Sequence, residues 1–189
     1  MKAYIHLAAV PMRSEPSHRS EMVNQLTAGD TATLISSQGD WIELQSDYDG
    51  YQGWVDSRQA TLFEGPADLA ERLFLGTPYL WGGRSTGGID CSGLTQVCFK
   101  AAGIWLPRDA YQQATSGNEI CLCDVRRDDL AFFHNPEGRV VHVGICTGDG
   151  RIVHSSGMVR IDTLDSHGIF EERTQSYSHL LHSVRRLTT

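Results

Sequence analysis

The sequence lacks two features that would point to nucleic acid or membranes: an excess of positive charge, and an apolar run long enough to cross a bilayer. Its 189 residues include 16 Lys and Arg against 23 Asp and Glu, for a net charge of −7 at pH 7. This balance argues against nucleic acid and anionic membrane surfaces as main partners. The hydrophobic content of 40% and charged content of 21% are typical of a soluble globular protein with one core, or one core and a smaller second one.

The sequence also lacks an even set of cysteines. The five are Cys91, Cys98, Cys121, Cys123 and Cys146. An odd count argues against a disulfide framework and favours a reducing compartment. Cys121 and Cys123, in "CLCD", resemble half of a metal site, but no second pair follows at zinc-finger spacing, so we interpret them as ordinary strand cysteines. No metal and no cofactor are predicted.

A recognisable secretory leader is lacking as well. The first residues, "MKAYIHLAAVPMR", contain one lysine and a short apolar run interrupted by His6, and no small-x-small cleavage site follows. We therefore expect a cytoplasmic location if Met1 is the native start, and a secreted or periplasmic one if a leader has been removed. No internal repeat is visible.

Residues 1–64 are predicted to form a small β-barrel. The segments "TATLISS", "DWIELQS" and "YQGWVD" alternate or carry β-branched and aromatic residues, and turn sequences separate them. Trp41 and Trp54 are interpreted as core or wall of this barrel rather than as a pair that stacks on a ligand.

Residues 65–189 are predicted to form a second domain of the α+β class. Pro66 before "ADLAERLFL" and Gly76 after it predict a short helix. Further along, the predicted strands are "DDLAFFH", "RVVHVGICT", "GRIVHSS", "MVRIDTL" and "HSVRRL". Helices first and an antiparallel sheet afterwards is an α+β order.

One cysteine stands in an unusual setting, the segment "GIDCSGLTQ" at residues 88–96. Apolar residues recur after it at helical spacing and Gly103 ends the pattern, so Cys91 is expected in or beside the first turn of a helix capped by Asp90 or Ser92. A helix N-terminus lowers the pKa of a thiol, which predicts an exposed, nucleophilic thiolate. A passive thiol at a helix cap is the alternative. Cys98, on the apolar stripe, is interpreted as core.

Two of the eight histidines lie inside apolar strands. His142 is in "VVHVGICTG", and His154 follows on the next strand in "GRIVHSSG". Each is either a satisfied core residue or functional; together with Cys91 they suggest a nucleophile, a base and an orienting group. For the two rings to share a face, the connecting loop needs an odd length. We predict a three-residue loop, a type I turn followed by Gly150 at positive φ, and a hydrogen bond between the imidazoles.

Four segments in order resemble the motifs of the NlpC-type cell-wall cysteine peptidases. They are "YLWGGRSTGGIDCSGLTQ" (79–96), "LPRDAYQQ" (106–113), "DLAFF" (129–133) and "HVGICTGDGRIVHSSG" (142–157). The first sixty residues resemble the bacterial SH3-like domain that precedes this domain in the γ-D-glutamyl-L-diamino-acid endopeptidases. "SEMVNQLTAGD" (20–30) and "GDWIELQ" with "YQGWV" (39–55) carry that second resemblance.

The resemblance implies a reduced papain-like α+β domain after an SH3-like barrel. It makes Cys91 the nucleophile, His142 the base and His154 the residue that orients His142. Tyr79 would join the Cys91 N–H in the oxyanion hole.

The resemblance also implies a substrate, the γ-D-glutamyl–diamino-acid bond of a peptidoglycan stem peptide with a free N-terminal L-Ala, cleaved during muropeptide recycling. Asp90 and Ser92 would hold the alanine amine, and Glu21 and Tyr51 of the first domain are the candidates to close that pocket. Two positions depart from the family pattern: Ala110 replaces a serine, and Asp128 replaces a glycine. The competing hypotheses are a silent wall-binding module and an acyl transferase or amidase that uses the same thiolate.

Overall fold

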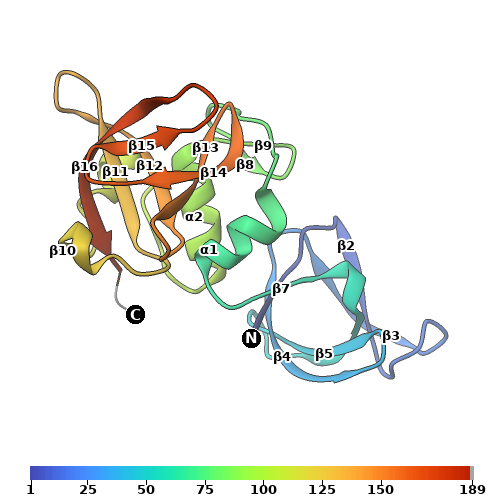
Figure 1. Ribbon diagram of the computed structural model, residues 1–189. Coiled ribbons are helices and arrows are strands. Elements are labelled where there is room, and N and C mark those ends of the chain that lie inside the picture. The colour runs from blue at the N-terminus through green and yellow to red at the C-terminus, as the bar shows by residue number, and fades with distance from the viewer. Residues whose placement is uncertain (188–189) are drawn as a thin grey trace. The chain divides into compact units, whose positions relative to one another are not determined.

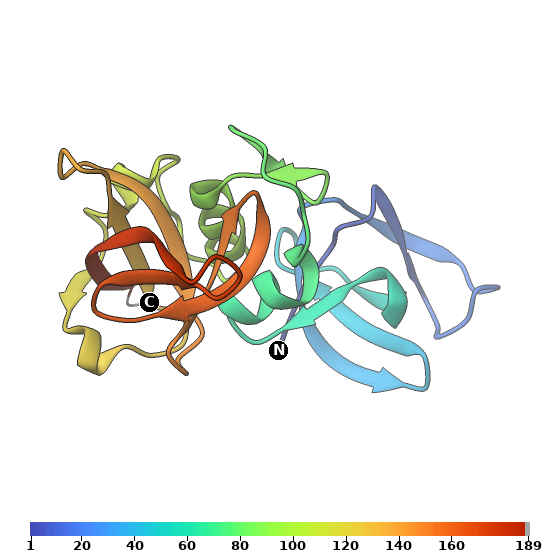
Figure 2. The same cartoon turned by 45° about the horizontal axis from the view of Figure 1, so that its top comes forward.

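The computed structural model describes residues 1–187, and the chain falls into two compact units, one over Met1–Glu64 and the other from Gly65 onward. Figures 1 and 2 show the ribbon from two directions. Within residues 1–187, no helix has the length and apolar character that a membrane crossing requires.

The first unit is a single antiparallel sheet of seven strands that encloses a small core, as predicted. The strands are β1 (Lys2–Tyr4), β2 (Ala9–Arg13), β3 (Met22–Thr27), β4 (Thr31–Gln38), β5 (Trp41–Ser46), β6 (Gln52–Asp56) and β7 (Thr61–Phe63), in the order β3-β2-β6-β5-β4-β1-β7. A short 3-10 turn, η1 (Ser57–Gln59), precedes β7. Ile5, Met12 and Leu44 are fully buried, whereas Trp41 and Trp54 are half-buried and belong to the wall.

The helices of the second unit come early in its sequence. They are α1 (Pro66–Leu69), continued by the π-helical turn η2 (Ala70–Phe74), then α2 (Cys91–Ala101), α3 (Ala110–Gln113) and the 3-10 turn η3 (Leu122–Asp124). Pro66 is the first residue of α1, and Gly76 follows η2 at φ 80°, as the sequence predicted. The interpretation of Cys121 and Cys123 as strand cysteines is wrong: they cap and occupy η3, and both are exposed.

An antiparallel sheet makes up most of the remaining second unit. Its strands are β10 (Asn118–Ile120), β11 (Leu130–His134), β12 (Val140–Cys146), β13 (Arg151–Ser156), β14 (Met158–Leu164), β15 (Gly168–Glu171) and β16 (Ser176–Arg186), in the order β10-β16-β11-β12-β13-β14-β15. Because the long strand β16 pairs with both β11 and β15, the strands from β11 to β16 close into a ring. The predicted α+β order is confirmed; β10 and β15 were not predicted.

Helix α2 packs on β12 and β13, the two strands that carry the candidate histidines. A small hairpin of β8 (Arg84–Ser85) and β9 (Gly88–Ile89) leads directly into α2. In Figure 2 this hairpin is the bright green element at the top, next to the helix.

The β12–β13 loop has the odd length that the sequence predicted. Cys146 pairs with Ile152, and the N–H of Thr147 donates to the carbonyl of Arg151 at 3.0 Å, which leaves residues 148–150 as the loop. Gly150 has φ 78°, as predicted, but Gly148 has φ 86°. The predicted type I turn is therefore wrong, since such a turn needs a negative φ at its first central residue.

Candidate active site

Cys91 is the first residue of α2. The carboxylate of Asp90 caps the helix by accepting a hydrogen bond from the N–H of Gly93 at 2.7 Å, so Asp90 rather than Ser92 is the cap. A Cβ atom on Gly93 would collide with the carbonyl of Gly83, which shows how closely the "WGG" loop lies against this turn. Hairpin, cap and glycines together hold the sulfur at the N-terminal end of the helix.

The thiol of Cys91 is not the exposed thiolate that the sequence predicted. The residue is only 6% exposed, and burial raises the pKa of the Cys91 thiol above its ordinary value. The nearby Asp90 carboxylate adds to the rise, while the backbone N–H of Val143 acts in the opposite direction. The sequence predicted the effect of the helix end on the thiol but not its burial against strand β12, which depends on tertiary packing.

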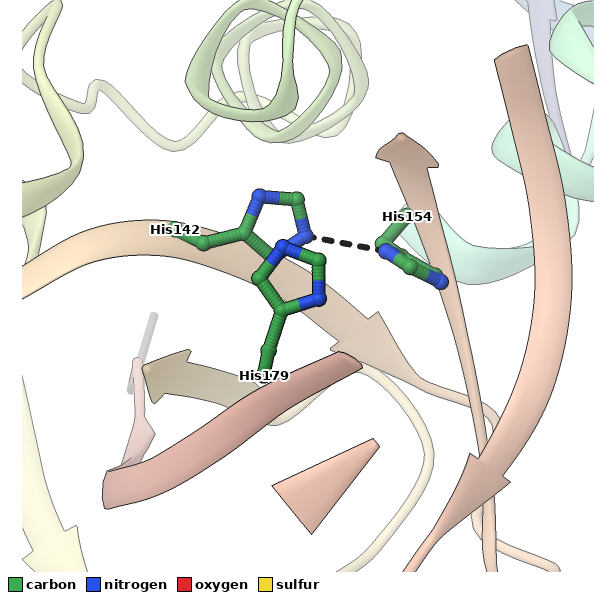
Figure 3. A group of neighbouring side chains, drawn as sticks. All are labelled: His142, His154 and His179. Carbon is green, nitrogen blue, oxygen red and sulfur yellow. Dashed lines mark hydrogen bonds between the residues drawn. The ribbon is translucent and has the colours of Figure 1, made fainter. Parts of the chain in front are cut away.

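His142 and His154 are joined by the predicted hydrogen bond. Nε2 of His142 lies 2.9 Å from Nδ1 of His154, and Figure 3 shows this bond as a dashed line between the rings. The other nitrogen of His154, Nε2, lies 2.8 Å from a carboxylate oxygen of Asp162 on β14. Both nitrogens of His154 are thus engaged, whereas Nδ1 of His142 remains on the side of the green helix in Figure 3.

A third histidine, His179 on β16, belongs to this group although the sequence analysis gave it no special setting. Its ring stacks on that of His142, with centroids 4.0 Å apart and planes 22° from parallel (Figure 3). Burial, His179 and His154 together lower the pKa of His142 well below the ordinary value for histidine, so His142 is neutral at neutral pH. A neutral imidazole is the form that can accept a proton.

Gly144 makes room for the histidine pair. It lies between the histidine positions on the same face of the sheet and pairs directly with His154. A Cβ atom at Gly144 would lie 2.9 Å from Cβ of His154 and 2.6 Å from the end of the Ile152 side chain. The glycine in "HVGIC" therefore allows His154 to lean toward His142.

Tyr79, the predicted oxyanion residue, lies close enough to Cys91 for the two side chains to interact electrostatically. Its backbone bridges to Ile89, just before the helix cap. Burial raises the pKa of the Tyr79 phenol, and electrostatic interactions with Cys91 and Asp90 raise it further, so the hydroxyl keeps its proton as a hydrogen-bond donor.

The carboxylate of Asp90 is already paired with an arginine that the sequence did not single out. Arg108 donates to both of its oxygens, at 3.0 and 2.5 Å, and the N–H groups of Gly82 and Gly93 also donate to it. Burial alone would raise the pKa of Asp90, but these bonds hold it below its ordinary value. Arg108 also donates to the hydroxyl of Ser92 at 2.9 Å. The sequence analysis missed Arg108, which stands in the quoted "LPRDAYQQ" motif.

Cys91 and the group of Asp90, Ser92 and Arg108 open onto a cleft of about 710 Å³. The cleft is lined by Trp81, Gly82, Asp90, Cys91, Ser92, Arg108, Asp109, Ala110, Tyr111, Val140 and Val141. Trp81 and Tyr111 are largely exposed, so the walls offer aromatic surface beside the charged pair of Asp90 and Arg108. Such a cleft suits a ligand with both apolar and ionic groups.

The other predicted pocket residues, Glu21 and Tyr51, belong to the first unit. Glu21 is exposed and lies just before β3, and Tyr51 is 42% exposed just before β6. Their part in closing a pocket stays a prediction.

Within residues 1–187, one group of side chains has the composition of a metal site. Ring nitrogens of His142, His154 and His179 lie within 4.8 Å of one another. A metal ion there would have to replace the hydrogen bond between His142 and His154, because His154 uses both nitrogens already. The hydrogen-bonded arrangement fits acid–base chemistry better than ligation.

Known family models match segments of both units of the chain. The NlpC/P60 family model matches residues 76–178, which include Tyr79, Cys91 and both histidines of the bonded pair. The bacterial dipeptidyl-peptidase SH3 domain model matches residues 12–59. The α+β fold with an SH3-like barrel in front is confirmed.

Individual relatives agree with these families. The chain is 49% identical over 85 residues (44% of this chain) to the gamma-D-glutamyl-L-lysine dipeptidyl-peptidase of Bacillus subtilis, and 33% identical over 138 residues (65%) to the protein of that name in Bacillus cereus. It spans 29% and 41% of those two proteins. The crystal structure of an NlpC/P60 family protein from Bacillus cereus covers all of this chain with a TM-score of 0.60 at 26% identity, and the match takes in 63% of that chain.

Proposed function

Because the chain belongs to the NlpC/P60 family, we propose that it is a cysteine peptidase that hydrolyses the γ-D-glutamyl–diamino-acid bond of peptidoglycan stem peptides. The observation that carries the proposal is the position of Cys91, at the start of α2 and on the wall of the cleft, together with the bonded pair of His142 and His154. The names of the two Bacillus relatives support the choice of bond.

In the proposed reaction, the sulfur of Cys91 attacks the γ-carbonyl carbon of D-glutamate while the thiol proton moves to Nδ1 of His142. The raised pKa of Cys91 and the lowered pKa of His142 mean that this proton moves during the attack and not before it. His142 then returns the proton to the departing diamino-acid nitrogen, and an acyl-enzyme remains. Water, deprotonated by His142, then attacks the thioester carbon and the carbon–sulfur bond breaks. The L-Ala-γ-D-Glu product leaves, and His142 returns the proton to the sulfur of Cys91.

The negative charge that develops on the carbonyl oxygen needs donors beside the sulfur. The N–H of Cys91 is at the first position of α2, where the helix itself provides no acceptor, and the hydroxyl of Tyr79 lies near the same residue. These two donors form the oxyanion hole in our proposal.

For the substrate end, we propose a free alanine amine that binds near Asp90 and Ser92, in a role within muropeptide recycling. In this chain the amine would share the Asp90 carboxylate with Arg108, whose guanidinium already holds both oxygens. Arg108 also presents positive charge to the cleft, which suits the free α-carboxylate of the D-glutamyl residue.

The test is to incubate the protein with L-Ala-γ-D-Glu-diaminopimelate and with its N-acetylated analogue, and to follow the products by mass. Release of diaminopimelate from the free peptide alone supports both the bond and the amine. Equal rates on both peptides support the bond and refute the amine pocket. No cleavage of either peptide by the folded protein favours a silent binding module, and transfer of the acyl group to added hydroxylamine in preference to water favours a transferase. Cys91→Ser is the control.

A further inference from the structure

We propose that Asp162 is a positioning residue that sets the direction of the hydrogen bonds through His154 to His142, so that Nδ1 of His142, on the side of helix α2 (Figure 3), carries no proton. The proposal deepens the proposed function and rests on it for its kinetic consequences. The direction of the bonds is a property of the free protein and can be measured without a substrate.

A continuous row of hydrogen bonds crosses three neighbouring strands. Asp162 on β14 lies 2.8 Å from Nε2 of His154 on β13, and Nδ1 of His154 lies 2.9 Å from Nε2 of His142 on β12. His154 is fully buried and His142 is 5% exposed, so bulk water does not compete for the hydrogen bond between the two rings, whereas the side chain of Asp162 is 12% exposed. Asp162 does not line the cleft beside Cys91 but borders a separate hollow together with Arg160 and Glu171, so in this proposal it acts on the nucleophile through the histidines.

The chemistry of the carboxylate decides where the protons lie. An ionised carboxylate has acceptors and no donor, so His154 must carry its proton on Nε2 to bond with Asp162. In neutral His154, Nδ1 then has a lone pair, and only a proton on Nε2 of His142 can complete the second bond. In neutral His142 this leaves Nδ1 free of a proton. The opposite tautomer would place a proton where the base needs a lone pair.

Arg160 fixes the carboxylate at the end of this row of hydrogen bonds. Its Nε donates to the same oxygen of Asp162 at 2.7 Å, and its Nη1 lies 3.2 Å from Glu171 on β15. The guanidinium is thereby held between two carboxylates, which restricts the rotamer of Asp162. It also draws part of the negative charge of Asp162 away from His154.

The experiment combines long-range ¹H–¹⁵N spectra of the histidine rings with steady-state kinetics, in the wild type, Asp162→Asn and Asp162→Ala. We expect wild-type His154 and His142 both to carry their proton on Nε2. Asp162→Ala loses this preference and lowers kcat by at least about 10-fold with little change in KM. Asp162→Asn offers Nε2 of His154 both an acceptor and a donor, so we expect it to hold the tautomers less firmly than the wild type and to give a kcat between those of the wild type and Asp162→Ala. Asp165→Asn is the matched control. The Asp165 carboxylate accepts a hydrogen bond from the hydroxyl of Tyr177, and the ring nitrogen of His167 is 3.8 Å away, beyond hydrogen-bond distance.

Two results would overturn the inference. A proton on Nδ1 of either histidine in the wild type does so by itself, even if Asp162→Ala fails to fold or the protein cleaves no peptide. Unchanged tautomers and unchanged kcat in folded Asp162→Ala do so as well. If the tautomers are as expected but neither peptide is cleaved, the proposed function fails and the positioning role of Asp162 stands.

Discussion

At Cys91, two effects act on the same sulfur in opposite directions. The start of α2 favours the thiolate, because unsatisfied N–H groups and the helix dipole stabilise negative charge there. The cover provided by β12 opposes it, since a buried sulfur loses the hydration that a thiolate needs. The raised pKa means that burial wins in the free protein. Burial therefore favours a neutral Cys91 thiol and a neutral His142 imidazole in the free protein.

This balance predicts the order in which the cysteines react. We expect iodoacetamide at neutral pH to label Cys121 before Cys91, because Cys121 is exposed and the hydrogen bond from Cys123 lowers its pKa. Cys98 and Cys146 should label last, since burial raises their pKa values, for Cys146 to about 12. Peptide mapping by mass at a series of reaction times measures the order.

The control is a Cys121→Ser, Cys123→Ser double variant, which should retain full peptidase activity. Cys91→Ser should remove turnover without unfolding the protein. If Cys91 is labelled ahead of Cys121, the thiolate predicted from the helix end is present after all, and the resting state is an ion pair with His142.

At the scale of elements, a glycine on β12 determines how closely the side chains of His142 and His154 approach each other. Gly144 leaves the space into which His154 leans.

At the start of α1, an aspartate takes the place of a glycine. Asp128 stands where the family pattern has glycine, and it keeps the positive φ of a glycine, 71°. Its carboxylate accepts a hydrogen bond from the N–H of Ala67 at 2.7 Å and so caps α1. The departure noted in the sequence is a structural cap.

Gly144→Ala should separate the histidine pair. The added methyl must displace Ile152 or His154, so we expect a loss of stability of about 1–3 kcal/mol and a fall in kcat that exceeds any change in KM. Urea unfolding and peptide kinetics measure the two effects. Gly87→Ala is the matched control, because the nearest atom to a Cβ there is a side-chain oxygen 3.6 Å away. An active Gly144→Ala variant would show that His154 need not reach His142.

Asp128→Asn should stabilise the protein at neutral pH by less than about 1 kcal/mol, since the site is partly exposed. Burial raises the pKa of Asp128, so its charged form is disfavoured in the folded state, whereas asparagine keeps a cap acceptor and tolerates positive φ. Because the pKa of Asp128 is higher in the folded than in the unfolded state, the free energy of unfolding falls as the pH rises from the unfolded pKa through the folded pKa. The gain from Asn should therefore disappear below the ordinary pKa of Asp. Asp128→Ala, which loses the cap, should instead lower stability by about 1 kcal/mol.

For the molecule as a whole, acid stability depends on histidines that are buried in the neutral form. Burial, followed by His154 and Arg160, lowers the pKa of His179 to about 4, and His142 is lowered as well. Because the pKa values are lower in the folded than in the unfolded state, these groups contribute stability above the unfolded value near 6.5, and this contribution is lost as the pH falls.

The melting temperature should accordingly be highest above about pH 6.5 and fall between there and pH 4. His179→Asn should flatten this fall, because one of the groups that must take up a proton is gone. Thermal melts at closely spaced pH values compare the two proteins, with His167→Asn as the exposed control. If the melting temperatures of the wild type and His179→Asn fall equally between pH 6.5 and pH 4, the pKa of the half-buried His179 is not lowered in the folded protein.

Several parts of this protein were determined by short stretches of sequence. The helix after Cys91, its cap and the three-residue loop follow from local propensity, side-chain capping and strand parity, all of which act over a few neighbouring residues. For that reason the hydrogen bond between His142 and His154 could be predicted before the structure was known. The family motifs pointed to the same residues.

Other parts were decided only by the tertiary structure. At Cys91, burial under β12 raises the pKa of the thiol more than the helix end lowers it. Arg108 forms an ion pair with the carboxylate of Asp90. Asp162 on β14 and His179 on β16 contact the histidine pair. Each of these contacts joins residues that are distant along the chain or lie on different elements. Burial and hydrogen bonding depend on which elements the closed ring brings together, and neither propensity nor spacing encodes that arrangement.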